Sequence, residues 1–190
     1  MKIISALKIC FLLSALALTA CTGVPDKVTP VSGFKLNHYL GEWYEIARLD
    51  HSFERGLSHI TAHYSMRDDG GVRVINQGFN AKEGEWKQAE GKAYFIGAAD
   101  QAHLKVSFFG PFYGSYIVFE LDKENYQYAF ISGPDTDYLW LLSRTPEVSD
   151  ELRQHFITEA EKRGFDTSGL IFPDQNAASK PDGAPGVLAY

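Results

Sequence analysis

The sequence predicts an all-β domain: an eight-stranded antiparallel up-and-down β-barrel with one C-terminal α-helix packed outside. Apolar side chains recur at every second position in short runs, which is the pattern of strands with one buried face. Turn-forming stretches such as "RDDGG" separate the runs, and a helical period follows the last of them. Eight strands joined by short loops favour a closed barrel, because closure leaves no unpaired sheet edge.

Length and composition set the scale of the domain. The chain has 190 residues and is 45% hydrophobic, enough to bury one substantial core and hardly two. A formal net charge of −6, without long runs of Lys and Arg, argues against nucleic acid as a partner. We expect one domain at residues 33–173, between a turn-rich linker at 21–32 and a mobile, Pro- and Gly-rich tail at 174–190.

The N-terminus differs from the rest of the chain. Lys2 and Lys8 flank the start of the apolar run "ICFLLSALALTA", which is typical of a signal peptide and too short to span a bilayer. The letters "LTAC" resemble a bacterial lipobox, so we expect a lipoprotein signal peptide at residues 1–20 and acyl chains on Cys21 that anchor the protein to a membrane. The alternative is an ordinary secretory signal with an incidental cysteine.

Two further expectations depend on that lipidation. Thr22 stands where an Asp would suggest retention in the inner membrane, so the resemblance to bacterial lipoproteins implies the outer membrane, with the periplasmic face as the expected side. Cys10 leaves with the signal and Cys21 is acylated, so the mature chain is expected to have neither a free thiol nor a disulfide. Its core alone must then hold the domain together.

The eight predicted strands follow one another along the chain. In order they are "YEIARL", "SHITAHYSM", "VRVINQGF", "KQAEGKAYFI", "HLKVSFF", "SYIVFEL", "YQYAFIS" and "YLWLLSR". The second and fifth alternate most clearly. Their apolar residues, which we expect to line the barrel interior, are Ile60, Ala62, Tyr64, Leu104, Val106 and Phe108.

One helix is predicted after the eighth strand. Ser149 is a suitable N-cap, and Gly164 suits the position just past the C-terminus. Leu152, Phe156 and Ala160 recur at every fourth residue and form a narrow apolar stripe. We interpret the stripe as ordinary packing against the outside of the barrel.

Several stretches carry a family resemblance. "GEWY" at 41–44 on the first strand, Arg144 ending the eighth in "LLSRTP", and the helix after it resemble the lipocalin family. "LGEWYEIARLDHSFERG", "KVSFFGPFYG" and "GPDTDYLWLLSRTP" resemble more narrowly the bacterial outer-membrane lipocalin lipoproteins of the Blc type. The resemblance implies structural roles at the closed end for Gly41, Trp43 and Arg144, with the guanidinium packed against the indole.

One signature of the family is altered. A Thr-Asp-Tyr sequence, which the family carries between strands six and seven, occurs here at 136–138, between strands seven and eight. The matching position is "LDKEN", where Asp122 agrees but Leu121 and Lys123 replace Thr and Tyr. The barrel prediction does not depend on this motif.

The open end follows from the position of Trp43. Since Trp43 begins the first strand at the closed end, alternate loops, at about residues 50–57, 80–85, 109–114 and 133–137, should surround the mouth. Ligand contacts are expected there from Tyr113, Trp140 and Arg48, and a head group could meet Arg48, His51 or Arg55. For these charges a solvated surface position is the alternative, and for aromatic residues such as Phe109, Phe112 and Tyr113 it is packing within the rim or a homodimer face.

An apolar slot of this kind suits an acyl chain. The resemblance implies that the ligand is a fatty acid or lysophospholipid, stored or transported for maintenance of the cell envelope. The alternative is a structural or interaction lipoprotein whose barrel is filled by its own side chains.

The sequence predicts no catalytic residue, no cofactor and no metal site. His59 and His63 would lie about 13 Å apart on a strand, at roughly 3.3 Å per residue, which is too far to share an ion. The cavity thiol that some lipocalin-like enzymes use is missing from the expected mature chain. Glu45 is a single candidate for a buried, perturbed carboxylate, and one acid is too little to indicate an enzyme.

Overall fold

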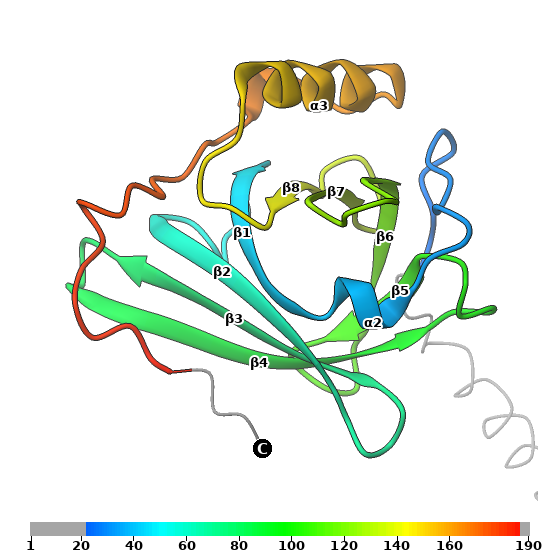
Figure 1. The fold of residues 1–190 in the computed structure, drawn as a ribbon, viewed down its shortest axis with the longest axis horizontal. Helices are drawn as coiled ribbons and strands as arrows, with labels where there is room; N and C mark the ends of the chain where they lie inside the picture. Colours follow the sequence, from blue (N-terminus) through cyan, green and yellow to red (C-terminus); the bar gives the residue numbers. More distant parts are fainter. Residues whose placement is uncertain (1–21, 187–190) are drawn as a thin grey trace, which may run out of the picture.

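The computed structural model describes residues 22–186. The predicted signal peptide and the acylation of Cys21 therefore lie outside the described residues. Eight antiparallel strands close into one barrel in sequence order, and β8 pairs back to β1, which confirms the predicted fold class (Figure 1). The strands are β1 Gly41–Arg48, β2 Leu57–Met66, β3 Val72–Asn80, β4 Glu85–Phe95, β5 His103–Ser107, β6 Gly114–Leu121, β7 Tyr128–Ser132 and β8 Leu139–Ser143.

Two α-helices within residues 22–186 lie at different places on the barrel. The predicted helix, α3 (Asp150–Lys162), packs along the outside, where the Ser149 hydroxyl accepts a hydrogen bond from the Leu152 amide at 3.2 Å (Figure 1). Gly164 follows α3 with a φ of +89°, as expected of a glycine that ends a helix. A short helix that the sequence did not reveal, α2 (Leu36–Tyr39), lies at the end of the barrel where β1 begins. A 3₁₀ turn, η1 (Thr167–Gly169), follows α3.

The buried residues form two clusters on opposite sides of the barrel wall. One fills the closed part of the barrel and includes Trp43, Ala62, Tyr64, Val74 and Leu104. The other lies between the wall and α3, where the rings of Phe130 and Phe156 have their centroids 5.0 Å apart. The apolar stripe of α3 therefore serves packing, as its spacing indicated.

Two bulges shape the wall that faces α3. In β1 the pairing with β8 shifts between Glu45 and Ala47, so Ile46 is an extra residue. In β6 the pairing with β7 shifts between Val118 and Glu120, so Phe119 is an extra residue. Ile46 and Phe119 both pack in the cluster against α3. A bulge interrupts the strict alternation of faces, which is why periodicity alone could not place these side chains.

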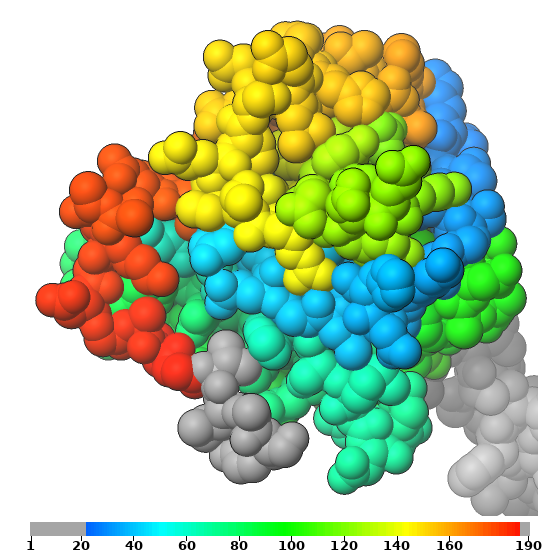
Figure 2. All heavy atoms as spheres, in the orientation of Figure 1, coloured from blue at the N-terminus to red at the C-terminus, as the bar shows by residue number. Residues whose placement is uncertain are grey.

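Trp43 and Arg144 close one end of the barrel. The Arg144 guanidinium lies 3.9 Å from the centre of the Trp43 ring and donates to the carbonyl oxygens of Glu42, His38 and Leu40 at 2.6, 2.8 and 2.9 Å. The Trp43 indole N–H donates to the Tyr39 carbonyl at 2.8 Å. Gly41 adopts a φ of +94°, which a residue with a side chain rarely adopts. In Figure 2 atoms of α2 and β1 cover this end of the barrel.

The segments before and after the barrel lie against it. Val31 donates to the Val118 carbonyl at 2.9 Å, and Val28 is buried in the cluster beneath α3, so much of the predicted linker is docked on the wall. Beyond the domain boundary predicted at residue 173, the His59 amide donates to the Asp174 carbonyl at 2.7 Å. The Trp86 indole donates to the Asp182 carbonyl at 3.1 Å, so the predicted tail also contacts the barrel.

Replacing Trp43 should destabilise the fold more than replacing a tryptophan on the outside. Trp43→Ala removes a fully buried ring and the surface on which Arg144 packs, so the free energy of unfolding should fall by about 3–5 kcal/mol. Trp86→Ala is the matched control, because Trp86 is only half-buried on β4. Urea unfolding of both variants measures the losses, and equal losses would contradict a central role for Trp43.

Candidate functional site

The β1 bulge brings two charged side chains to the same face of one strand. Residues three apart on a regular strand point to opposite sides of the sheet. Because Ile46 is an extra residue, Glu45 and Arg48 instead meet on the inner face of the barrel wall, where Arg48 Nη1 donates to Glu45 Oε1 at 2.7 Å. Both side chains are almost completely buried. The sequence alone placed Arg48 near the mouth but did not pair it.

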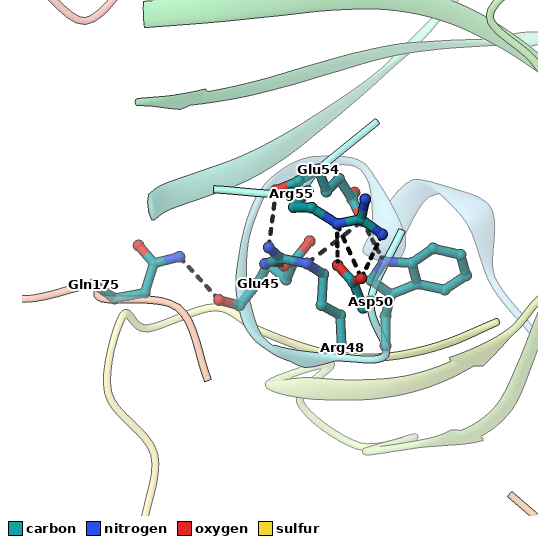
Figure 3. Close-up of polar contacts among 7 residues, drawn as sticks. Glu45, Arg48, Asp50, Glu54, Arg55 and Gln175 are labelled. Atoms are coloured by element: carbon teal, nitrogen blue, oxygen red, sulfur yellow. Dashed lines mark hydrogen bonds and ion pairs between the residues drawn. The ribbon is translucent and has the colours of Figure 1, made fainter. Parts of the chain in front are cut away.

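The loop after β1 completes this polar cluster. Arg48 Nη2 donates to the Glu54 carbonyl at 2.8 Å, and the Glu54 carboxylate lies 4.0 Å from Arg48 Nε (Figure 3). The Trp140 indole, on β8, donates to Glu54 Oε2 at 3.1 Å. The cluster of Glu45, Arg48, Glu54 and Trp140 therefore joins β1, its following loop and β8 near the open end of the barrel.

Burial raises the pKa of both glutamates in the cluster. Desolvation holds the pKa of Glu45 well above its usual 4.5, and the neighbouring Glu54 carboxylate adds to the increase, while Arg48 opposes it. Desolvation also raises the pKa of Glu54, against the lowering effects of Trp140 and Arg48. One arginine is thus shared by two carboxyl groups, and ionising both glutamates gives the cluster a net negative charge.

The other predicted head-group residues are engaged in different ways. Arg55 pairs with Asp50 at 2.6 Å, and both side chains are exposed to solvent (Figure 3). His51 stacks between Phe53 and Tyr138, with ring centroids 5.2 and 4.5 Å away. Desolvation lowers the pKa of His51, which favours the neutral ring.

The residues predicted to line the interior fall in two groups. Ile60, Ala62, Tyr64 and Leu104 are buried, and Ala62, Tyr64 and Leu104 lie in the inner cluster. Val106, Phe108 and Trp140 are partly buried and pack against that cluster. Tyr113 lies apart from them, against Lys105, whose ammonium is 5.0 Å from the tyrosine ring centre.

Three tyrosines form a polar layer above the closed end that the sequence did not reveal. The Tyr116 hydroxyl lies 2.6 Å from the Tyr39 hydroxyl and 2.9 Å from the Tyr64 hydroxyl. The three come from β6, α2 and β2, so strand alternation alone could not bring them together. Their hydroxyl groups satisfy one another in an otherwise apolar part of the barrel.

Small residues on β4 leave space for a large neighbour. A Cβ on Gly91 would lie 2.8 Å from the Phe108 ring, closer than side chains tolerate. Gly91 therefore accommodates the Phe108 ring where β4 meets the end of β5, rather than widening an empty slot.

The C-terminal segment seals a gap between β1 and β2. Their pairing ends at Tyr44 and Thr61, and the next carbonyls, of Glu45 and Ile60, both accept from the Gln175 side-chain amide at 2.9 and 2.8 Å. Figure 3 shows Gln175 reaching the Glu45 carbonyl from outside. A cavity of about 330 Å³ lies beside this segment, lined by residues that include Ile46, Arg153, Phe172 and Gln175.

The described part of the chain lacks two other kinds of feature. Within residues 22–186 no three His, Cys, Asp or Glu side chains are grouped so as to hold a metal ion. In the same range no helix has the length and apolar character needed to cross a membrane.

Comparison with known proteins assigns the family. The sequence model of the protein family described as the lipocalin-like domain matches residues 34–175. This chain belongs to the lipocalin-like family. The lipocalin is 60% identical over 164 residues to the outer membrane lipoprotein Blc of Vibrio cholerae, covering 86% of this chain and 96% of that protein. It is 56% identical to the protein of the same name from Escherichia coli K12, covering 85% and 92%.

Solved structures agree on the fold. Insecticyanin from the tobacco hornworm Manduca sexta matches with a TM-score of 0.63 at 22% identity, over 83% of this chain and 89% of that one. Lobster apocrustacyanin A1 matches with a TM-score of 0.61 at 17% identity, over 82% and 94%. The close bacterial relatives indicate that this lipocalin is an outer-membrane lipoprotein.

The lipocalin should lose stability through Glu45 as the pH rises. The pKa of Glu45 is higher in the folded state, so its contribution is fully present below the unfolded pKa of about 4.3 and is lost as the pH rises through the folded value. Glu45→Gln removes this pH-dependent loss of stability, because the glutamine does not ionise. The Glu54 carboxylate remains to neutralise the charge of Arg48. The variant should therefore gain stability relative to the wild type as the pH rises above about 4.3, by about 1.4 kcal/mol for each pKa unit between the two states.

Urea unfolding across this pH range measures the difference. Glu42→Gln is the matched control, because it makes the same change at an exposed position of β1. A constant difference between Glu45→Gln and the wild type at all pH values would show that the buried carboxyl does not titrate as described.

Proposed function

We propose that this lipocalin binds fatty acids or lysophospholipids in its barrel and stores or transports them for maintenance of the cell envelope. An acyl anchor on Cys21 would hold it to the outer membrane, with the periplasmic face as the expected side. The name shared by its close relatives, outer membrane lipoprotein, supports the location. The observation that carries the binding proposal is an apolar-lined barrel, sealed at one end by Trp43 and Arg144, whose other end holds a buried polar cluster.

The energetics of an acyl chain fit such a barrel. Burying about sixteen methylenes at roughly 0.8 kcal/mol each gives on the order of 12 kcal/mol before costs. Lost motion of ligand and protein removes several kcal/mol, which leaves micromolar to nanomolar affinity as the expectation. Binding of this kind is reversible partitioning and needs no covalent step, in keeping with a binding protein rather than an enzyme.

The polar cluster favours one ligand over the other. A fatty acid carboxylate would compete with Glu45 and Glu54 for a single arginine, and it would be repelled by whichever glutamate is ionised. A lysophospholipid with an ethanolamine head group has an ammonium that can approach the glutamates and a phosphate that can approach Arg48. We therefore expect lyso-phosphatidylethanolamine to bind more tightly than oleate.

Native mass spectrometry of the chain from Thr22 onward tests this proposal, because residues 22–186 contain both core clusters. After mild purification we expect a stoichiometric adduct with oleate that lyso-phosphatidylethanolamine displaces. If no lipid adduct is found either directly after purification or after the lipids are added, the alternative is favoured, a structural or interaction lipoprotein whose barrel is filled by its own side chains.

A pair of neighbouring substitutions locates the bound lipid. Val106→Asn places an amide on the inner face of β5, where an unpaired polar group costs about 1–3 kcal/mol, so lipid affinity should fall about tenfold. Lys105→Asn is the control, since the Lys105 side chain lies against Tyr113 rather than the inner cluster. Circular dichroism checks that both variants fold, and equal affinities would place the lipid elsewhere.

A further inference from the structure

The described chain begins at the open end of the barrel. A Cβ on Gly23 would lie 3.3 Å from the carbonyl oxygen of Pro134, so Gly23 lies against the loop between β7 and β8. That loop belongs to the same end as the loop between β1 and β2, since His51 stacks on Tyr138. From there the chain runs along the wall to α2 at the closed end, held by hydrogen bonds from Val31 and Phe34.

This path leaves little free chain before the anchor site. Cys21 precedes Gly23 by two residues, which span at most about 7 Å at roughly 3.5 Å per residue. The segment predicted as a linker therefore cannot carry the barrel far from the membrane. An acyl group on Cys21 would enter the bilayer close to the loop between β7 and β8.

Large apolar side chains are exposed at this same end. Phe53, in the loop after β1, is 60% exposed, and Phe109 and Phe112, in the loop after β5, are 79% and 72% exposed. The loop after β5 reads "FFGPFY" and contains no charged residue. Exposed phenylalanines in an uncharged loop mark an interaction surface, and aromatic side chains are favourable in the interfacial region of a bilayer.

The closed end has a different surface. Its turn between β2 and β3 contains Arg67, Asp68 and Asp69, and its turn between β6 and β7 contains Asp122, Lys123 and Glu124. Ionised side chains of this kind favour water over the lipid interface. The loops at the mouth also carry ionised side chains, such as Asp50, Arg55 and Glu83, so what distinguishes the mouth is its exposed phenylalanines.

We propose that the anchored lipocalin lies with its barrel mouth against the membrane, with Phe53, Phe109 and Phe112 in contact with lipid. The proposal rests on the acylation of Cys21 within the proposed function. A lipid surface fits this face better than a second copy of the chain, because the short tether holds the mouth too close to the bilayer for another barrel to lie between them. Lipid can then pass between bilayer and barrel without crossing water.

Single cysteines on the full-length lipoprotein test this orientation. Phe109→Cys and Phe112→Cys place a thiol at the mouth, and Lys123→Cys, at an exposed residue of the turn between β6 and β7 on the closed end, is the matched control. Each variant is labelled with an environment-sensitive fluorophore and reconstituted into phosphatidylethanolamine–phosphatidylglycerol vesicles. We expect nitroxide lipids with a shallow label to quench the mouth positions severalfold more than position 123, and aqueous iodide to show the reverse order.

The possible results separate the orientation from the anchor. Vesicle flotation, and the failure of the wild-type chain to take up the label, report acylation of Cys21 independently. A chain that floats but shows equal quenching at both ends, or stronger quenching at position 123, overturns the orientation alone. Mouth positions shielded from iodide but not quenched by lipid would indicate a second copy and would also overturn it. If the wild-type chain does not float with the vesicles, Cys21 is not acylated, and the proposal is overturned together with its anchor.

Discussion

The contact between the Arg144 guanidinium and the Trp43 indole is the constraint on which the barrel depends. Arg144 is at the end of β8 and Trp43 is on β1, so their stacking at 3.9 Å joins the first strand to the last. The same guanidinium donates to the carbonyl oxygens of His38, Leu40 and Glu42, so it also holds α2 and the start of β1 at this end of the barrel. One side chain thus positions the short helix, closes the ring and sets which end remains open.

The open end owes its chemistry to an irregularity in β1. A regular strand would direct Arg48 outward toward α3, where the surroundings are apolar. The extra residue at Ile46 turns it inward to Glu45, and the following loop supplies Glu54. Burying three ionisable groups costs stability unless they pair, and here two acids share one base. This arrangement sacrifices stability at neutral pH and places both signs of charge beside the apolar inner cluster, which is the basis of the proposed preference for a zwitterionic head group.

The sequence predicted the parts of the fold that follow from periodicity and local chemistry. Alternation located all eight strands, and Ser149 and Gly164 located the ends of α3, because both signals depend on a few neighbouring residues. The inward turn of Arg48 was not predictable, since a bulge depends on how β1 pairs with β8. The docking of Gln175 was missed for a related reason. The polar, Pro- and Gly-rich composition of residues 174–190 shows that this segment cannot form a core of its own, but it does not show whether its side chains hydrogen-bond to a strand elsewhere.

The Gln175 bridge has a consequence for how the protein is made. Its amide completes the wall between β1 and β2, from 130 and 115 residues further along the chain than the carbonyls it bonds. Contacts of such sequence separation form late, because a long loop must close before they can be made. A chain emerging from its N-terminus exposes the first strands while the residues that seal them are still to come. The wall between β1 and β2 therefore stays open until the last segment of the chain has been made.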